Sequence, residues 1–143
     1  MKVLVLNGPN IGRLDIRDSS IYGDMTYPAL VAHIEGAAKT HGFDADVRQS
    51  NYEAEIIGWL HEAADTDTPF IINPAAFTHY SYAIRDAAEL VKAPLIEVHL
   101  SNPLSREEFR HTSVISGVAN GTIGGFGPNS YVLALIALKA LVA

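Results

Sequence analysis

VLVLNGPN, residues 3–10, places four consecutive apolar residues directly before an Asn-Gly-Pro turn signal. Four residues are too few for a helix, and a short run that is apolar at every position is typical of a strand buried on both faces. Gly8 and Pro9 then stop the strand. This stretch therefore predicts an interior strand of a layered α/β fold, followed by a loop at its carboxyl end.

Similar short runs alternate with segments of helical period along the rest of the chain. The runs predict strands at 43–49, 70–72, 95–100 and 118–123. The periodic segments predict three helices with clear bounds, at 26–40, after 73–74 to about 92, and from about 129 to 143. Capping-box spacings at 50–53 and 105–108 predict the starts of two more helices, of which the second can only be short. Right-handed crossovers make such strands parallel, with helices on both faces. We predict one domain, 1–143, with a flavodoxin-like αβα sandwich and a five-stranded parallel sheet of order 2-1-3-4-5.

Composition excludes several classes of function and site. The net charge of −6 disfavours nucleic acid as a partner, and the absence of cysteine excludes disulfides, thiolate nucleophiles and cysteine metal sites. The chain does not start like a signal peptide, and its longest apolar stretch, 132–143, is shorter than the ~20 residues that a membrane span needs. The sequence thus predicts a soluble cytoplasmic protein.

Ligands of such sheets bind beyond the carboxyl ends of the strands. The loop there from Asn7 to Met25 is about nineteen residues long, against a usual ~2–6, which indicates a lid or binding loop containing Asn10, Arg17 and Tyr22. An unperturbed tyrosine is only about one part in 10³ ionised at neutral pH, and a nearby guanidinium favours the phenolate. The alternative is a surface arginine beside a tyrosine packed on the rim.

Two other loops at this edge carry polar residues. Asn73 ends a strand, and His79 is predicted at the start of a helix, where backbone N–H groups favour anions. Glu97 and His99 share one face of a strand, so the carboxylate can orient the imidazole as a general acid. A structural histidine is the competing interpretation.

Surface patterns suggest an anionic ligand and subunit contacts. Arg106 and Arg110 lie one helical turn apart, and Arg17 with Arg110 near one pocket would suit an anionic small substrate, although a solvated helix face explains the pair equally. The polar stripe that includes His79 and Asp86 is expected to face solvent, whereas the apolar segment 131–138 predicts a subunit contact.

Several motifs together resemble the type II 3-dehydroquinate dehydratases over essentially the whole chain. They occur in the family's order, which makes the match highly specific. The carrying segments are Leu6–Asn10, Arg17 with Ile21–Gly23, Gln49–Asn51, Ile72–Pro74 with Thr78–His79, Ala83–Asp86, Glu97–Asn102, Arg106–His111 and Gly124–Gly127.

The resemblance implies dehydration of 3-dehydroquinate to 3-dehydroshikimate, a shikimate-pathway step, by anti elimination through an enolate without metal, Schiff base or other cofactor. Tyr22 would remove the C2 proton, with Arg17 favouring its phenolate. His99, oriented by Glu97, would protonate the departing C1 hydroxyl. Asn10 is also assigned to the catalytic set by this resemblance.

The same resemblance assigns the substrate contacts. Asn73 would hold an ordered water or the enolate oxygen. The substrate's carboxylate and hydroxyls would be held by His79, Leu100, Ser101 and Arg110. Asp86 would reach into a neighbouring subunit's site, within a dodecamer built as a tetramer of trimers. Departures from the common family pattern occur at Gly12, Arg13, Asp15, Ser19, Tyr52, Ala54 and 75–77.

Three other functions compete with this interpretation. A flavin or nucleotide binder of the same fold needs a Ser/Thr/Gly-rich phosphate loop, which 7–10 does not offer. A phosphoreceiver domain needs acidic residues where Asn7 and Asn73 stand. A metal hydrolase using His79, Glu97 and His99 remains open on spacing, although no HExxH signature is present.

Overall fold

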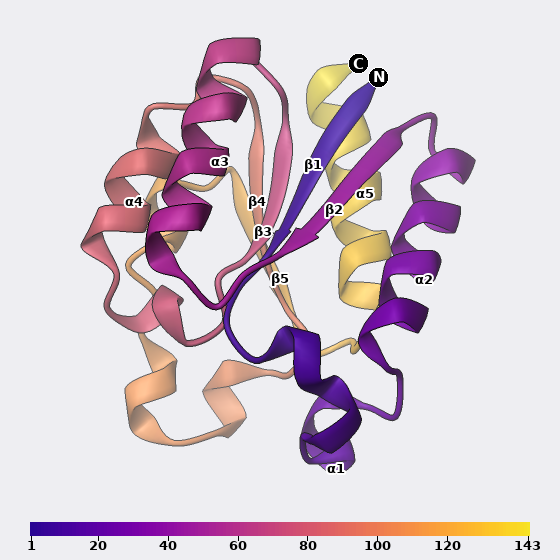
Figure 1. Cartoon of the computed structure of the whole chain (residues 1–143), viewed down its shortest axis with the longest axis vertical. Coiled ribbons are helices and arrows are strands. Elements are labelled where there is room, and N and C mark those ends of the chain that lie inside the picture. Colours follow the sequence, from indigo (N-terminus) through magenta and orange to yellow (C-terminus); the bar gives the residue numbers. More distant parts are fainter.

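A five-stranded parallel sheet forms the centre of the computed structural model, which describes all of residues 1–143 (Figure 1). The strands lie in the order β2-β1-β3-β4-β5, which confirms the predicted flavodoxin-like topology. Their bounds are β1 Lys2–Asn7, β2 Asp44–Gln49, β3 Phe70–Asn73, β4 Leu95–His99 and β5 Gly121–Gly124. In register, Asn7 pairs with both Gln49 and Asn73, so the carboxyl ends of the three strands meet at one edge.

Helices cover both faces of this sheet. α2 (Tyr27–Thr40) and α5 (Asn129–Val142) lie on one face, and α3 (Glu53–Thr66) and α4 (Tyr82–Glu89) lie on the other (Figure 1). Alternate side chains of β1 serve the two cores, because Val3 and Val5 pack with the α2 and α5 side whereas Leu4 and Leu6 pack with α3 and α4. None of these helices is long and apolar enough to cross a membrane.

The long first loop has secondary structure of its own. A 3₁₀ helix at Ile11–Ile16 is followed by the short helix α1 (Ser19–Tyr22), which the sequence did not predict. The Asp18 carboxylate caps α1 by accepting a hydrogen bond from the backbone N–H of Ser20 at 3.0 Å. This capped turn fixes the chain direction between Arg17 and Tyr22.

The two predicted capping boxes do not form. At the start of α3 the Ser50 hydroxyl accepts from Tyr52 N–H, and Glu53 accepts from the Ser81 hydroxyl at 2.6 Å, so neither makes the reciprocal bonds of a capping box. The spacing at Ser105 precedes only a 3₁₀ turn at Glu108–His111. In both places a tertiary or local partner satisfies the polar side chain instead.

The segment after β3 differs from the predicted single helix. Residues Ala75–His79 form a 3₁₀ turn, and α4 begins only at Tyr82, where the Ser81 hydroxyl accepts from Ile84 N–H at 3.1 Å. The interpretation of His79 as a helix-start residue was therefore wrong, because it lies at the end of a separate turn. α4 ends at Glu89, short of the predicted 92.

The carboxyl-terminal third contains two more short turns. Residues Pro103–Ser105 and Ser116–Val118 are 3₁₀ helices. Because the second turn includes Val118, β5 begins only at Gly121 rather than at the predicted residue 118. α5 exposes Leu133, Ile136 and Leu141, as its apolar circumference predicted for an isolated chain.

Candidate active site

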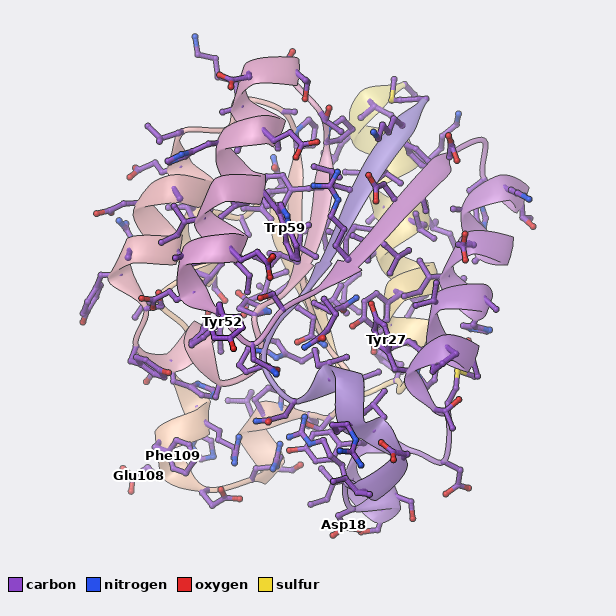
Figure 2. All side chains as sticks on the ribbon, in the orientation of Figure 1. Asp18, Tyr27, Tyr52, Trp59, Glu108 and Phe109 are labelled. Atoms are coloured by element: carbon purple, nitrogen blue, oxygen red, sulfur yellow. The ribbon has the colours of Figure 1, made fainter.

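One cavity lies at the carboxyl edge of the sheet, as the fold predicted. Its walls come from the first loop, the 75–79 turn, the end of β4 and the 103–111 segment, with fifteen residues: Pro9, Asn10, Ile11, Arg17, Tyr22, Asn73, Ala75, Ala76, His79, His99, Leu100, Ser101, Pro103, Arg106 and Arg110. Figure 2 shows Asp18 of the first loop and Phe109 of the 103–111 segment at this end of the molecule. Of the eleven predicted site residues, Glu97 and Asp86 are outside this lining.

Guanidinium groups gather around the Tyr22 ring. The Arg17 Cζ atom lies 3.5 Å from the ring centroid, and the Arg106 Cζ atom lies 4.9 Å from it. Burial, together with repulsion from Arg106 and Arg110, holds the pKa of Arg17 below its ordinary value, although Tyr22 opposes this shift. Such a concentration of positive charge favours an anionic ligand in the cavity.

Arg106 is the clearest addition to the predicted site. Its Nη1 donates to the Ser101 hydroxyl at 3.3 Å, while its Nε is buried without a hydrogen-bond partner. The one-turn spacing of Arg106 and Arg110 was the available signal, since it predicted that both side chains point the same way. Both line the cavity, although only Arg110 belongs to the 3₁₀ turn at Glu108–His111 and Arg106 precedes it in an extended conformation.

Asn10 is held at the cavity by the loop after β2. Its backbone is left-handed, with φ of 70°, and its N–H donates to the Asn51 side-chain oxygen at 3.0 Å. Gln49 Nε2 donates to the same oxygen at 3.1 Å. A Cβ at Gly12 would lie 2.8 Å from Gln49 Oε1, so the absence of a side chain at position 12 makes room for this arrangement.

Glu97 and His99 form the predicted pair. His99 Nε2 lies 2.6 Å from Glu97 Oε2, and Glu97 is only 1% exposed. Because Nε2 faces Glu97, Nδ1 is the ring nitrogen that remains for a ligand. The two side chains project from the same face of β4, as the period of a strand requires.

Hydroxyl groups complete the shell around the Glu97 carboxylate. Thr78 donates at 2.5 Å, Ser116 at 2.7 Å and Ser113 at 2.9 Å. Burial alone raises the pKa of Glu97, but His99 and the hydroxyls outweigh burial and hold it below its ordinary 4.5. These three hydroxyls were missed from the sequence; the signal was the buried position of Glu97, since a buried carboxylate requires donors.

The lowered pKa of Glu97 gives a prediction on acid stability. A carboxyl with a depressed folded-state pKa stabilises the fold above its unfolded value of about 4.5 and loses that contribution as pH falls through the lower folded value. We expect Glu97→Gln to lower the free energy of unfolding by about 1 to 3 kcal/mol at pH 7, and by progressively less below pH 4.5. Denaturant unfolding from pH 7 to pH 3 measures this difference.

The control for that comparison is Glu55→Gln, an exposed position on α3. Its effect on stability should be small at every pH. A Glu97→Gln penalty that stays constant from pH 7 to pH 3 would contradict the assigned role of the carboxylate.

Asn73 lies at the junction of the cavity and the core. It is 3% exposed, and its Oδ1 accepts from Ala75 N–H at 3.1 Å while its Nδ2 donates to the Tyr131 hydroxyl at 2.9 Å. Ala75 has φ of 51°, a left-handed conformation that strains a residue with a Cβ. The backbone is thus held in an unfavourable conformation where it meets the Asn73 amide.

Of the remaining residues predicted to bind substrate, four line the cavity and Asp86 does not. His79 Nδ1 donates to the Thr112 carbonyl at 2.8 Å, which leaves Nε2 free, and Arg110 Nε donates to Glu107 at 2.8 Å. Leu100 and Ser101 line the cavity directly after the Glu97–His99 pair. The Asp86 side chain is instead 76% exposed on α4 beside Arg85, so within one chain it does not reach the site.

No group of three or more His, Asp or Glu side chains is placed to hold a metal ion. A metal hydrolase would need such a group, and its candidate ligands His79, Glu97 and His99 do not form one. The polar side chains of the cavity are instead two imidazoles, a phenol, a hydroxyl, two amides and three guanidiniums.

Comparisons with known proteins agree with the resemblance seen in the motifs. The family model described as dehydroquinase class II matches residues 1–139. A 3-dehydroquinate dehydratase from Salinispora tropica is 52% identical over 140 residues, 98% of each chain, and one from Mycobacteroides abscessus is 53% identical over 135 residues, 94% of each chain. The crystal structure of a type II dehydroquinase from Propionibacterium acnes matches with a TM-score of 0.95 at 50% identity, over 97% of this chain and 96% of that one.

Proposed function

This chain belongs to the class II dehydroquinase family, whose reaction is the dehydration of 3-dehydroquinate in the shikimate pathway, and from this we propose how its own residues carry out the chemistry. Tyr22 is the base and His99 is the acid. One observation supports this assignment: the same cavity is lined by Tyr22 and by His99. The Tyr22 ring centroid lies 3.5 Å from the Arg17 Cζ atom, and His99 Nε2 lies 2.6 Å from the buried Glu97 carboxylate.

The first step is removal of the C2 proton by the Tyr22 phenolate. The C–H electron pair moves into the C2–C3 bond, and the C3 carbonyl becomes an enolate. Arg17 and Arg106 beside the ring favour the phenolate before the transfer. A free N–H of Asn73 stabilises the enolate oxygen, directly or through a water, where negative charge develops.

The second step expels the C1 hydroxyl as water. The enolate returns its electron pair to form the C1–C2 double bond, and His99 Nδ1–H supplies the proton to the leaving oxygen. Glu97 stabilises the imidazolium before the transfer. Tyr22 then holds one proton more and His99 one fewer, and exchange of a proton through solvent restores both groups.

Substrate binding uses the other polar groups of the cavity. Arg110 and the free Nε2 of His79 suit a carboxylate and a hydroxyl, and Ser101 offers a backbone N–H and a hydroxyl beside the dyad. The cationic cavity in a chain of net charge −6 accounts for selection of an anionic substrate.

A direct assay tests this function. We expect the purified protein to convert 3-dehydroquinate to a conjugated enone, followed by the rise of near-ultraviolet absorbance, and chelator treatment to leave the rate unchanged. A loss of rate that zinc restores would favour the metal-hydrolase alternative. Absence of enone formation by a folded protein would contradict the dehydratase chemistry itself.

We also propose that the chain assembles as a dodecamer, a tetramer of trimers, in which Asp86 contacts a neighbouring subunit's site. The exposed apolar side chains of α5 support this, since Leu133, Ile136 and Leu141 are each 39% to 48% exposed in the isolated chain. Asp86 is exposed beside Arg85 and is free to make such a contact.

Sedimentation tests the assembly. We expect the wild type to sediment near twelve times its 15.4 kDa chain mass, and Ile136→Glu to shift it to smaller species, because a buried unpaired charge opposes association. Lys139→Gln, on the same helix, is the control and should not change the mass. A wild type that sediments only as a monomer would contradict both the assembly and the role of Asp86.

A further inference from the structure

We propose that Tyr131, a residue of α5 outside the cavity, is a positioning residue that fixes the orientation of the Asn73 side-chain amide. The inference rests on the role proposed for Asn73 in binding the enolate oxygen. Tyr131 is fully buried among apolar side chains, and its hydroxyl joins Asn73 to Asn7 through two hydrogen bonds. It does not line the cavity.

The direction of each hydrogen bond follows from counting protons. The Tyr131 hydroxyl has one proton and gives it to Asn7 Oδ1 at 2.6 Å. It can therefore only accept from Asn73, whose Nδ2 donates to it at 2.9 Å. Burial raises the pKa of Tyr131, so the hydroxyl keeps the proton on which this direction depends.

A flipped Asn73 amide would be opposed at both ends. Its oxygen would face a hydroxyl oxygen whose proton is committed to Asn7, and its NH₂ group would face the N–H of Ala75, which now donates to Asn73 Oδ1 at 3.1 Å. In the observed orientation only one of the two Nδ2 hydrogens is used inside the protein. The second N–H remains as a donor for a ligand in the cavity that Asn73 lines.

The Asn7 side-chain amide is only partly hydrogen-bonded when it holds Tyr131 in this orientation. Its Oδ1 accepts from Tyr131, and its buried Nδ2 makes no hydrogen bond of good geometry, with only a weaker contact to the Tyr27 hydroxyl. A poorly satisfied buried donor destabilises a fold, so the Asn7 amide is not placed for stability alone. Its orientation supplies the acceptor that orders Tyr131, and Tyr131 in turn orders Asn73.

The test is a double-mutant cycle on dehydratase activity with Tyr131→Phe and Asn73→Ala. We expect Tyr131→Phe to lower kcat about tenfold with little change in KM, because the amide then samples the wrong orientation in the transition state. In the Asn73→Ala background the same substitution should change kcat less than about twofold, since no amide remains to be oriented. Ser130→Ala, which removes a neighbouring buried hydroxyl of α5, is the matched control and should leave kcat unchanged.

The outcomes separate the inference from the proposed function. If Asn73→Ala lowers kcat but the Tyr131→Phe penalty is as large in that background as in the wild type, Tyr131 acts independently and the inference is wrong. If Asn73→Ala has no effect on kcat, the role proposed for Asn73 fails as well. A wild type inactive on 3-dehydroquinate would instead contradict the function before the cycle begins.

A second variant keeps the test decisive if Tyr131→Phe does not fold. Asn7→Ala removes the acceptor and frees the Tyr131 proton, which can then be donated to a flipped Asn73 oxygen. We expect the same loss of kcat and the same lack of effect in the Asn73→Ala background. An Asn7→Ala enzyme with wild-type kcat would overturn the inference.

Discussion

We expect Tyr22→Phe to lower the dehydratase kcat by about 10³- to 10⁴-fold, because phenylalanine keeps the ring beside the Arg17 and Arg106 guanidiniums but has no group that can take the C2 proton. The fold should be retained, since the half-buried Tyr22 hydroxyl makes no hydrogen bond to the core. Steady-state kinetics on 3-dehydroquinate, with circular dichroism of the same sample, measures both quantities.

Tyr52→Phe is the matched control for this substitution. Tyr52 is 74% exposed before α3 and does not line the cavity, so loss of its hydroxyl should leave kcat unchanged. Full activity in Tyr22→Phe would refute Tyr22 as the base, whatever the effect on substrate binding.

Arg17→Ala has the second-largest expected effect, a fall in kcat of about 10²- to 10³-fold. The substitution removes the guanidinium nearest the Tyr22 ring, and the remaining Arg106 lies farther away, at 4.9 Å. The phenolate proposed to remove the C2 proton then loses its nearest counter-charge, so kcat should fall by more than KM rises. Steady-state kinetics on 3-dehydroquinate distinguishes this from a simple loss of substrate affinity.

Arg13→Ala tests whether any charge in the first loop suffices. Arg13 is exposed and pairs with Asp15 at 3.0 Å, away from the cavity, so its loss should change kcat less than about twofold. Arg17→Lys should recover only part of the activity, because an ammonium lacks the planar face that stacks on the ring. Equal losses in Arg13→Ala and Arg17→Ala would contradict the specific role of Arg17.

The sheet could be predicted from the sequence because its signal is local. Each strand is a short apolar run such as 3–6, and the crossover rule then makes the strands parallel, while their order followed from assigning the flavodoxin-like fold. Glu97 and His99 could be paired for the same reason, since residues two apart on a strand share a face. The helix boundaries near Ser50 and Ser105 failed because distant or local partners replaced the expected caps.

The groups that tune the site could not be predicted because their contacts span the chain. Ser113 and Ser116 reach Glu97 across 16 and 19 residues from a loop without periodicity. Tyr131 belongs to a segment whose apolar neighbours indicated only a subunit contact, yet its hydroxyl bonds residues 58 and 124 positions away. No pattern within a single element encodes such partners.

The contact between Asn7 and Tyr131 also has a consequence for synthesis on the ribosome. α5 is the last element of the chain to be synthesised, after all five strands. Until this helix packs on the sheet, Asn73 at the end of β3 has no phenol to direct its amide. If Asn73 is the enolate donor, as proposed, the catalytic geometry is completed only when the last helix of the chain docks.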